Sequence, residues 1–131
     1  MITEDYVSSE VAKLLKEKGF DEICDYAYCN DWGNKTIEFG LKQNKNSIYE
    51  LGGYNGAHWE YVSAPTYQMA TKWIRKVHNL HIFADYESDR GFQPNIIDLE
   101  TGANKINEMY NGYTNEQAVE AALKYSLENL I

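Results

Sequence analysis

The chain has 131 residues, 44% of them hydrophobic, and its 20 acidic and 12 basic side chains give a formal net charge of −8. This length suits one compact domain with a buried core, and the apolar content excludes a disordered chain. The negative charge lies in both halves and repels phosphate backbones, so we expect no direct nucleic-acid partner. We also expect no membrane span and no secretion signal, and therefore a cytoplasmic protein.

The first part, residues 1–63, predicts one helix followed by a β-rich region. Ser8 is placed to cap a helix that runs to Lys18, because Gly19 follows where a left-handed residue ends a helix. Runs of β-forming residues predict strands, and clusters of turn formers and glycines predict the loops between them. The predicted strands are Ile23–Cys29, Thr36–Leu41, Ile48–Leu51 and Trp59–Ser63, with loops at Asn30–Asn34 and Gly52–Gly56.

The second part, residues 64–131, predicts the order α-β-β-β-α. Thr66 is a good cap for a helix that runs to His78, with Met69, Trp73 and Val77 as one row of its buried face. The predicted strands are Leu80–Tyr86, Asn95–Leu99 and Lys105–Tyr110. The second of them starts at Asn95 because Pro94 disfavours a central strand.

The last helix carries the clearest signal in the chain. Thr114 and Gln117 have the spacing of a capping box, which predicts that the helix begins there. An apolar stripe then recurs at helical spacing, formed by Val119, Leu123, Leu127 and Leu130 with Ala118, Ala122 and Ile131 beside them. We therefore predict a single α+β domain over 1–131, in which an antiparallel β-sheet has helices packed on it.

The two cysteines and a histidine pair are the sharpest candidates for chemistry. Cys24 and Cys29 stand five positions apart in a predicted strand, on opposite faces and about 16 Å apart, too far for a disulfide. His78 and His81 are separated by two residues, closer than zinc sites usually place histidines. Buried thiols and a helix-end histidine explain these residues without a metal, so we expect no metal and no cofactor.

A nucleophilic site is the main enzymatic alternative. Either cysteine would need a histidine base, His58 or His81, and an orienting acid, Asp25 or Asp85. No motif places these residues together, and the glycine loop lacks the ending of a phosphate-binding loop. A small cysteine-dependent hydrolase or thiol enzyme stays open as an alternative, and we predict no catalytic residue.

Aromatic residues in and after the glycine loop form the best predicted contact surface. They are Tyr54, His58, Trp59 and Tyr61. Tyrosine and tryptophan bury much area at low entropic cost, so such a cluster suits a protein-contact patch. The alternative interpretation is that these rings cover one end of the sheet.

The chain resembles two groups of known proteins, one in the order of its elements and one in several stretches of its sequence. The order α-β-β-β-α is similar to the double-stranded-RNA-binding domain, but the last helix opens at Thr114–Glu120 without the basic residues of that family, so RNA binding is not implied. The chain also resembles small prophage and mobile-element proteins of gut bacteria that have no assigned activity. The matching residues are Ile2–Glu4, Val11–Glu22, Ser63–Thr66, Met69–Ala70, Trp73–Arg75, His78–Ile82, Tyr113–Ala118 and Ala121–Leu127. This resemblance implies an α/β sandwich and no catalytic residues.

These observations favour a non-catalytic protein that acts by binding another protein or itself. Two alternatives remain: the cysteine enzyme, and an acidic mimic of nucleic acid that binds a basic protein, or a weak nucleic-acid-binding module.

Overall fold

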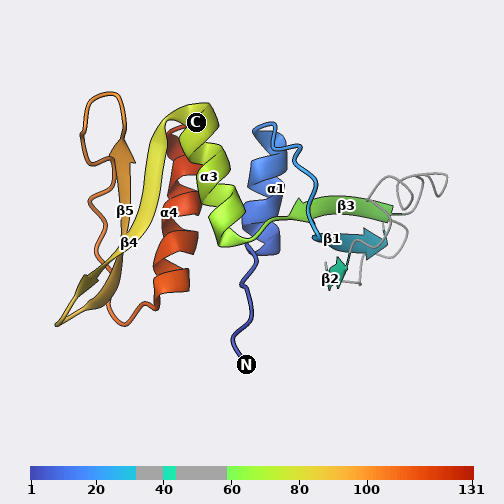
Figure 1. Ribbon diagram of the computed structural model, residues 1–131, viewed down its shortest axis with the longest axis horizontal. Helices are drawn as coiled ribbons and strands as arrows, with labels where there is room; N and C mark the ends of the chain where they lie inside the picture. Colours follow the sequence, from blue (N-terminus) through green and yellow to red (C-terminus); the bar gives the residue numbers. More distant parts are fainter. Residues whose placement is uncertain (32–39, 44–58) are drawn as a thin grey trace. The chain divides into compact units, whose positions relative to one another are not determined.

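The computed structural model describes residues 1–31, 40–43 and 59–131. They form two compact units: the N-terminal unit, Tyr6–Pro65, and the C-terminal unit, which joins Met1–Asp5 to Thr66–Ile131. The described residues contain helices and antiparallel sheets, which confirms the predicted α+β class (Figure 1).

The helix of the N-terminal unit begins and ends where predicted. Helix α1 spans Ser9–Glu17, and the Ser8 side chain accepts a hydrogen bond from a first-turn backbone N–H at 3.2 Å. Gly19 has a φ of 94°, a left-handed conformation that suits glycine at a helix end. The N–H of Phe20 then donates to the carbonyl of Leu15 at 2.9 Å, and both side chains are buried in the core of this unit.

The described strands of the N-terminal unit form one antiparallel sheet in the order β2-β1-β3. Their bounds are Tyr26–Asp31 for β1, Gly40–Gln43 for β2 and Trp59–Ala64 for β3. The strand at Trp59 is confirmed, and β1 pairs with β2 as the predicted hairpin does. Helix α1 packs against β3.

The predicted start of β1 at Ile23 is wrong, and Cys24 precedes the strand. Strand β1 begins at Tyr26, opposite Ala64, where β3 ends because Pro65 lacks a backbone donor. Its other end is also shifted, since Asn30 and Asp31 belong to the strand and not to the predicted loop. The remaining predicted elements fall wholly or partly outside the described residues: Thr36–Leu41, Ile48–Leu51, the rest of Asn30–Asn34, and Gly52–Gly56.

The C-terminal unit contains an antiparallel pair of strands, β4 at Leu80–Glu87 and β5 at Gly91–Asp98. Strand β5 starts earlier than predicted and includes Pro94, which lies opposite Ala84. Two backbone groups of β5, the Phe92 N–H and the Ile96 carbonyl, bond to residues that follow the strand, so they point away from β4. Pro94 lies midway between Phe92 and Ile96 and points to the same edge of β5. Its missing N–H therefore costs no hydrogen bond with β4.

The prediction of a third strand at Lys105–Tyr110 is wrong. The segment after β5 runs back beside it, with an isolated bridge between Ile97 and Asn104 and a bond from the Lys105 N–H to the Ile96 carbonyl at 2.8 Å. The order of this unit is therefore α-β-β-α.

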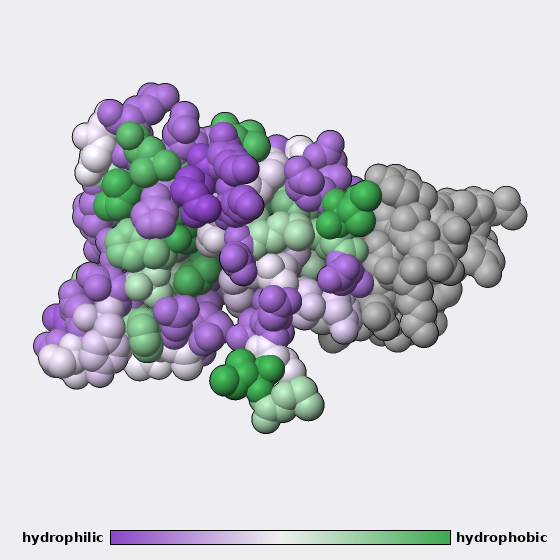
Figure 2. Space-filling model, viewed as in Figure 1, coloured by the Kyte–Doolittle hydropathy of each residue, from purple (hydrophilic) through white to green (hydrophobic). Residues whose placement is uncertain are grey.

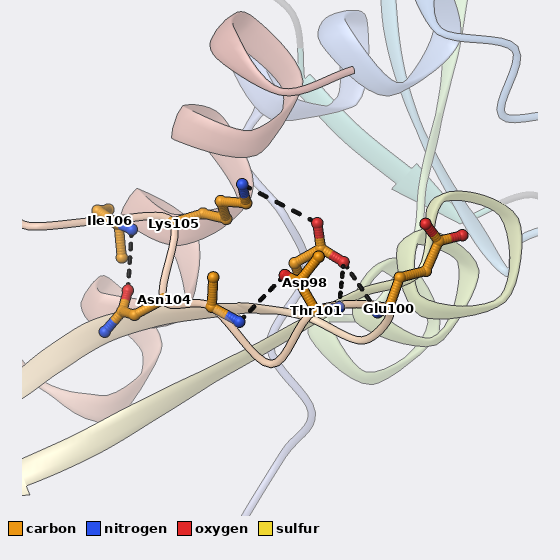
Figure 3. A network of polar contacts seen from close by, with 7 residues as sticks. Asp98, Glu100, Thr101, Asn104, Lys105 and Ile106 are labelled. Atoms are coloured by element: carbon orange, nitrogen blue, oxygen red, sulfur yellow. Dashed lines mark hydrogen bonds and ion pairs between the residues drawn. The ribbon is translucent and has the colours of Figure 1, made fainter.

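Side-chain bonds hold the turn after β5 and the start of the segment that follows it (Figure 3). Asp98 accepts from the backbone N–H groups of Glu100 and Thr101 and lies 4.0 Å from the Lys105 ammonium. The side-chain oxygen of Asn104 accepts from the Ile106 N–H at 2.9 Å. Such local bonds compete with regular strand pairing, which explains the irregular segment.

The two helices of the C-terminal unit are confirmed with their caps. Helix α3 spans Tyr67–His78 between N-cap Thr66 and left-handed Asn79, and α4 spans Asn115–Asn129 with a complete capping box. Helix α4 packs against both strands, and α3 packs against β4 and α4. Both helices therefore cover this sheet in one layer, as the sequence predicts.

The buried face of α3 is rotated from the predicted row. Trp73 is buried with Ala70 and Ile74, whereas Met69 is 37% exposed and Val77 is 55% exposed. The buried face of α3 is therefore centred on Ala70, Trp73 and Ile74, and the ends of the predicted row lie outside it. Helix α4 buries Ala118, Ala122, Leu123 and Leu127 as predicted, together with Ser126, which the apolar stripe does not include.

Candidate functional site

The predicted aromatic patch is described only in part. Tyr54 and His58 lie outside the described residues, and Trp59 and Tyr61 are placed by their backbone alone. Both belong to β3, where they pair with β1. The patch therefore stays a prediction.

Cys24 has the properties of a structural thiol. Its side chain is 4% exposed and donates to the Glu22 carbonyl at 3.5 Å. Burial raises the pKa of this thiol to about 11, and the charges of Asp25 and Glu22 act in the same direction. Because the thiolate is the nucleophile, a thiol with this pKa reacts slowly near neutral pH. This disfavours Cys24 as a nucleophile, and Cys29 is placed by its backbone alone.

His78 and His81 flank the junction between α3 and β4. The His78 ring meets Trp73 edge-on at 5.1 Å, and the His81 ring stacks on Phe83 at the same centroid distance. Within the described part of the chain, no group of three or more histidine, cysteine or acidic side chains is arranged to hold a metal ion. Both imidazoles therefore have packing partners in this unit.

A groove of about 580 Å³ follows α4 in the C-terminal unit. Its walls come from the polar face of α4, the first residue of α3, and the segment that joins β5 to α4. Tyrosine and glutamate supply eight of its twelve lining residues. The lining consists of Tyr67, Tyr110, Tyr113, Tyr125, Glu108, Glu116, Glu120, Glu128, Gln117, Ala121, Lys124 and Asn129.

Exposed apolar side chains of the same unit lie outside this groove. Figure 2 shows one face of the molecule, on which hydrophobic surface forms separate areas between hydrophilic residues. The large exposed apolar residues of this unit sit on the N-terminal segment and on several different elements: Met1, Ile2, Met69, Val77, Tyr86, Leu99 and Met109. Scattered apolar residues are normal on a protein surface, so the groove is the more distinctive feature.

One wall of the groove is a stacked pair of tyrosines. The rings of Tyr110 and Tyr113 lie 4.4 Å apart between centroids with an interplanar angle of 13°. Gln93 fixes the first of them, because its side-chain amide donates to the Tyr110 carbonyl at 2.6 Å and accepts from the Tyr110 N–H at 2.9 Å. Gln93 is only 3% exposed, so this two-bond clamp is shielded from water.

Tyr113 is fixed from the start of β5. Its carbonyl accepts from the Phe92 N–H at 3.2 Å, and the neighbouring Gly112 N–H donates to the backbone carbonyl of Arg90 at 2.9 Å. Gly91 has a φ of 89°, and a Cβ there would lie 3.1 Å from the Tyr113 carbonyl oxygen. The chain therefore needs glycine at this close approach. Thr114 then caps α4 directly after the tyrosine.

The opposite wall is the polar face of α4. Glu116, Glu120, Lys124 and Glu128 recur every four residues, so they form one row along the helix. Lys124 lies 3.9 Å from Glu128 in an ion pair between two half-exposed side chains. With Glu108 on the other wall, four glutamates face one lysine, which gives the lining a formal net charge of −3.

A hydrogen bond connects the tyrosine pair to this charge. The Tyr110 hydroxyl donates to a carboxylate oxygen of Glu108. This bond raises the pKa of Tyr110 to about 12, with burial and the charge of Glu108 adding to it. The shift keeps the phenol protonated to higher pH than an ordinary tyrosine, with its hydroxyl donating to the carboxylate.

A second, smaller hollow of about 190 Å³ adjoins the groove at the first turns of α3 and α4. It shares Tyr67 and Glu116 with the groove and adds the acidic residues Glu4 and Asp5. The negative lining therefore continues past the end of the groove.

Sequence reasoning did not find the groove, although one signal was available. The predicted helix after Thr114 shows its apolar stripe, and the i, i+4 row that begins at Glu116 lies beside it. That row predicts an acidic helix face. The tyrosine wall gives no such signal, because Gln93 and Tyr110 are 17 residues apart and meet only through the fold.

Comparison with known proteins finds no matching family model, curated sequence or solved structure.

None of the helices in the described residues is long and apolar enough to cross a membrane.

Proposed function

We propose that this is a non-catalytic binding protein that recognises a partner protein through the groove along α4. The observation that carries the proposal is the stacked pair Tyr110–Tyr113, whose backbone is held in place before any ligand arrives. Fixed aromatic side chains are favoured at binding surfaces because they bury area with little loss of entropy.

The wider setting is part of the same proposal. The resemblance to prophage and mobile-element proteins supports a role in the bacterial cytoplasm, where such a protein acts on a host or phage protein. The raised pKa of Cys24 supports a binding role over a thiol enzyme.

Selection of peptides from a random library on the full-length protein tests this proposal. Peptides selected on the wild type should bind the variant Tyr110→Ala/Tyr113→Ala at least about tenfold more weakly, because the aromatic anchors of an interface carry much of its affinity. Tyr86→Ala is the matched control, since Tyr86 is 61% exposed and lies outside the groove.

A third variant, Trp59→Ala/Tyr61→Ala, tests whether the predicted aromatic patch is the contact surface instead. If the selected peptides depend on Trp59 and Tyr61, and Trp59→Ala/Tyr61→Ala abolishes binding while the groove variant does not, the contact surface is the patch of Tyr54, His58, Trp59 and Tyr61. That result would replace the groove proposal.

A further inference from the structure

We propose that the groove takes an extended segment of its partner that is rich in lysine and arginine. This inference rests on the proposed binding function and names the chemistry of the partner. It follows from three properties of the same surface: its charge, its aromatic wall and its length.

The charge of the lining selects a cation. Glutamates line both walls of the groove, and its one lysine is already paired with Glu128. The adjoining hollow adds Glu4 and Asp5. An anionic ligand such as a nucleic-acid backbone would be repelled, whereas a basic segment is attracted before contact and held on arrival.

The aromatic wall suits the same ligand. The faces of tyrosine rings attract ammonium and guanidinium groups that come within about 6 Å of the ring centroid. Guanidinium groups also stack on flat rings, and Tyr110 and Tyr113 present nearly parallel planes. Because Glu108 accepts a hydrogen bond from the Tyr110 hydroxyl, a carboxylate stands beside this ring pair. One wall thus offers a ring face and a negative charge together.

The length of the groove distinguishes a peptide from a small polycation. Its α4 lining runs from Glu116 to Asn129, which corresponds to about 20 Å at 1.5 Å per helical residue. An extended peptide covers that length with about six residues at 3.3 Å each. A segment of this size places several basic side chains against both walls, whereas a small amine reaches only part of them.

Binding of labelled hexapeptides to the full-length protein, followed by fluorescence anisotropy at low and at high salt, tests the inference. The probe alternates lysine or arginine with serine, and its neutral counterpart carries glutamine in place of each basic residue. We expect the basic peptide to bind at least about tenfold more tightly than the neutral one, and added salt to weaken it.

Two variants with equal net charge separate the groove from the overall field. Glu116→Gln/Glu128→Gln removes two charges from the groove, and Glu17→Gln/Glu100→Gln removes two charges elsewhere. All four residues are exposed, so folding should be retained. The groove variant should bind the basic peptide about tenfold more weakly, and the control should change it less than about twofold.

Four outcomes overturn the inference. Equal weakening by both charge variants would show that only the net charge matters. Spermine that binds as tightly as the hexapeptide would assign the groove to a small polycation. Duplex DNA that binds more tightly than the hexapeptide would show that the ligand is an anion and not a cation. A neutral peptide that binds as well as the basic one, and is lost in Tyr110→Ala/Tyr113→Ala, would leave the binding function standing without this ligand class.

Discussion

The two walls of the groove are built in opposite ways. The tyrosine wall is held by backbone hydrogen bonds to β5 and by the buried Gln93, whereas the α4 wall consists of half-exposed or exposed charged side chains on a regular helix. The supports of the first wall belong to the fold around β5, where Gln93 is buried, so changes to these supports should lower stability. The second is a solvated surface, so changes there should alter binding and leave stability nearly unchanged. Substitutions on and around each wall should show this contrast in the free energy of unfolding.

Gln93→Ala should have the largest effect. It leaves a backbone donor and acceptor of Tyr110 without their partner, which should lower the free energy of unfolding by about 2–4 kcal/mol. Urea denaturation measures the change. The control Gln68→Ala, at an exposed position on α3, should stay within about 0.5 kcal/mol of wild type. Equal stability of the two variants would mean that the clamp does not support the tyrosine wall.

Gly91→Ala should lower stability by about 2 kcal/mol, because it adds a positive-φ strain and a close contact with the Tyr113 carbonyl. Gly102→Ala is the matched control, since that glycine also has positive φ but has nothing within 4 Å of the added Cβ. The control should lose about 1 kcal/mol, the strain alone. Thermal unfolding of both variants measures the difference in stability. Equal losses would show that the contact with the Tyr113 carbonyl costs nothing.

Ser126→Ala should raise the free energy of unfolding by about 1 kcal/mol. The Ser126 side chain is fully buried on the far face of α4, and its hydroxyl has no hydrogen-bond partner among the described residues. Removing an unpaired hydroxyl relieves its desolvation, and alanine also favours the helix. A fall in stability in urea denaturation would show that the hydroxyl is bonded after all.

Glu116→Gln/Glu128→Gln should change stability by less than about 1 kcal/mol, since exposed charges on a helix contribute little. The same variant is expected to weaken binding of the basic hexapeptide. Denaturation and anisotropy on one protein preparation give both values. A large loss of stability with unchanged binding would show that the α4 wall supports the fold and not the binding of the peptide.

The ionisation of Tyr110 should affect the folded state only at high pH. Its pKa is raised from 10.0 to about 12, so its contribution to stability is complete below pH 10 and is lost as the pH rises through 12. Glu108→Gln should return this pKa toward 10.0, whereas Glu116→Gln should not. NMR titration of ring-labelled tyrosine, assigned with Tyr110→Phe, measures it. An unchanged pKa in Glu108→Gln would exclude the Glu108 carboxylate as its cause.

Local signals predicted the helices well, because caps are made by residues three or four positions apart. Ser8, Thr66 and Thr114 each cap the helix that follows them, and Gly19 ends the first helix as expected. The α+β class and the packing of α3 and α4 on one sheet followed from the spacing of apolar residues. These features depend on short-range patterns, which the sequence shows directly.

The errors arose where distant residues decide the structure. Pro94 lies in a strand because its missing donor faces away from β4. The predicted strand at Lys105–Tyr110 is absent, and the side chains of Asn104 and Gln93 bond to the backbone of this segment. The tyrosine wall depends on a pairing between Gln93 and Tyr110 that no local pattern encodes. The groove could therefore be predicted only on its α4 side, from the row that begins at Glu116.

Chemical-shift mapping with the basic hexapeptide on the full-length, isotope-labelled protein shows where on the surface the peptide binds. We expect the largest changes at Tyr110, Tyr113 and the α4 residues from Glu116 to Asn129, with no comparable changes elsewhere in the described residues. The largest changes at β3, or small uniform changes over the whole surface, would contradict a binding groove along α4.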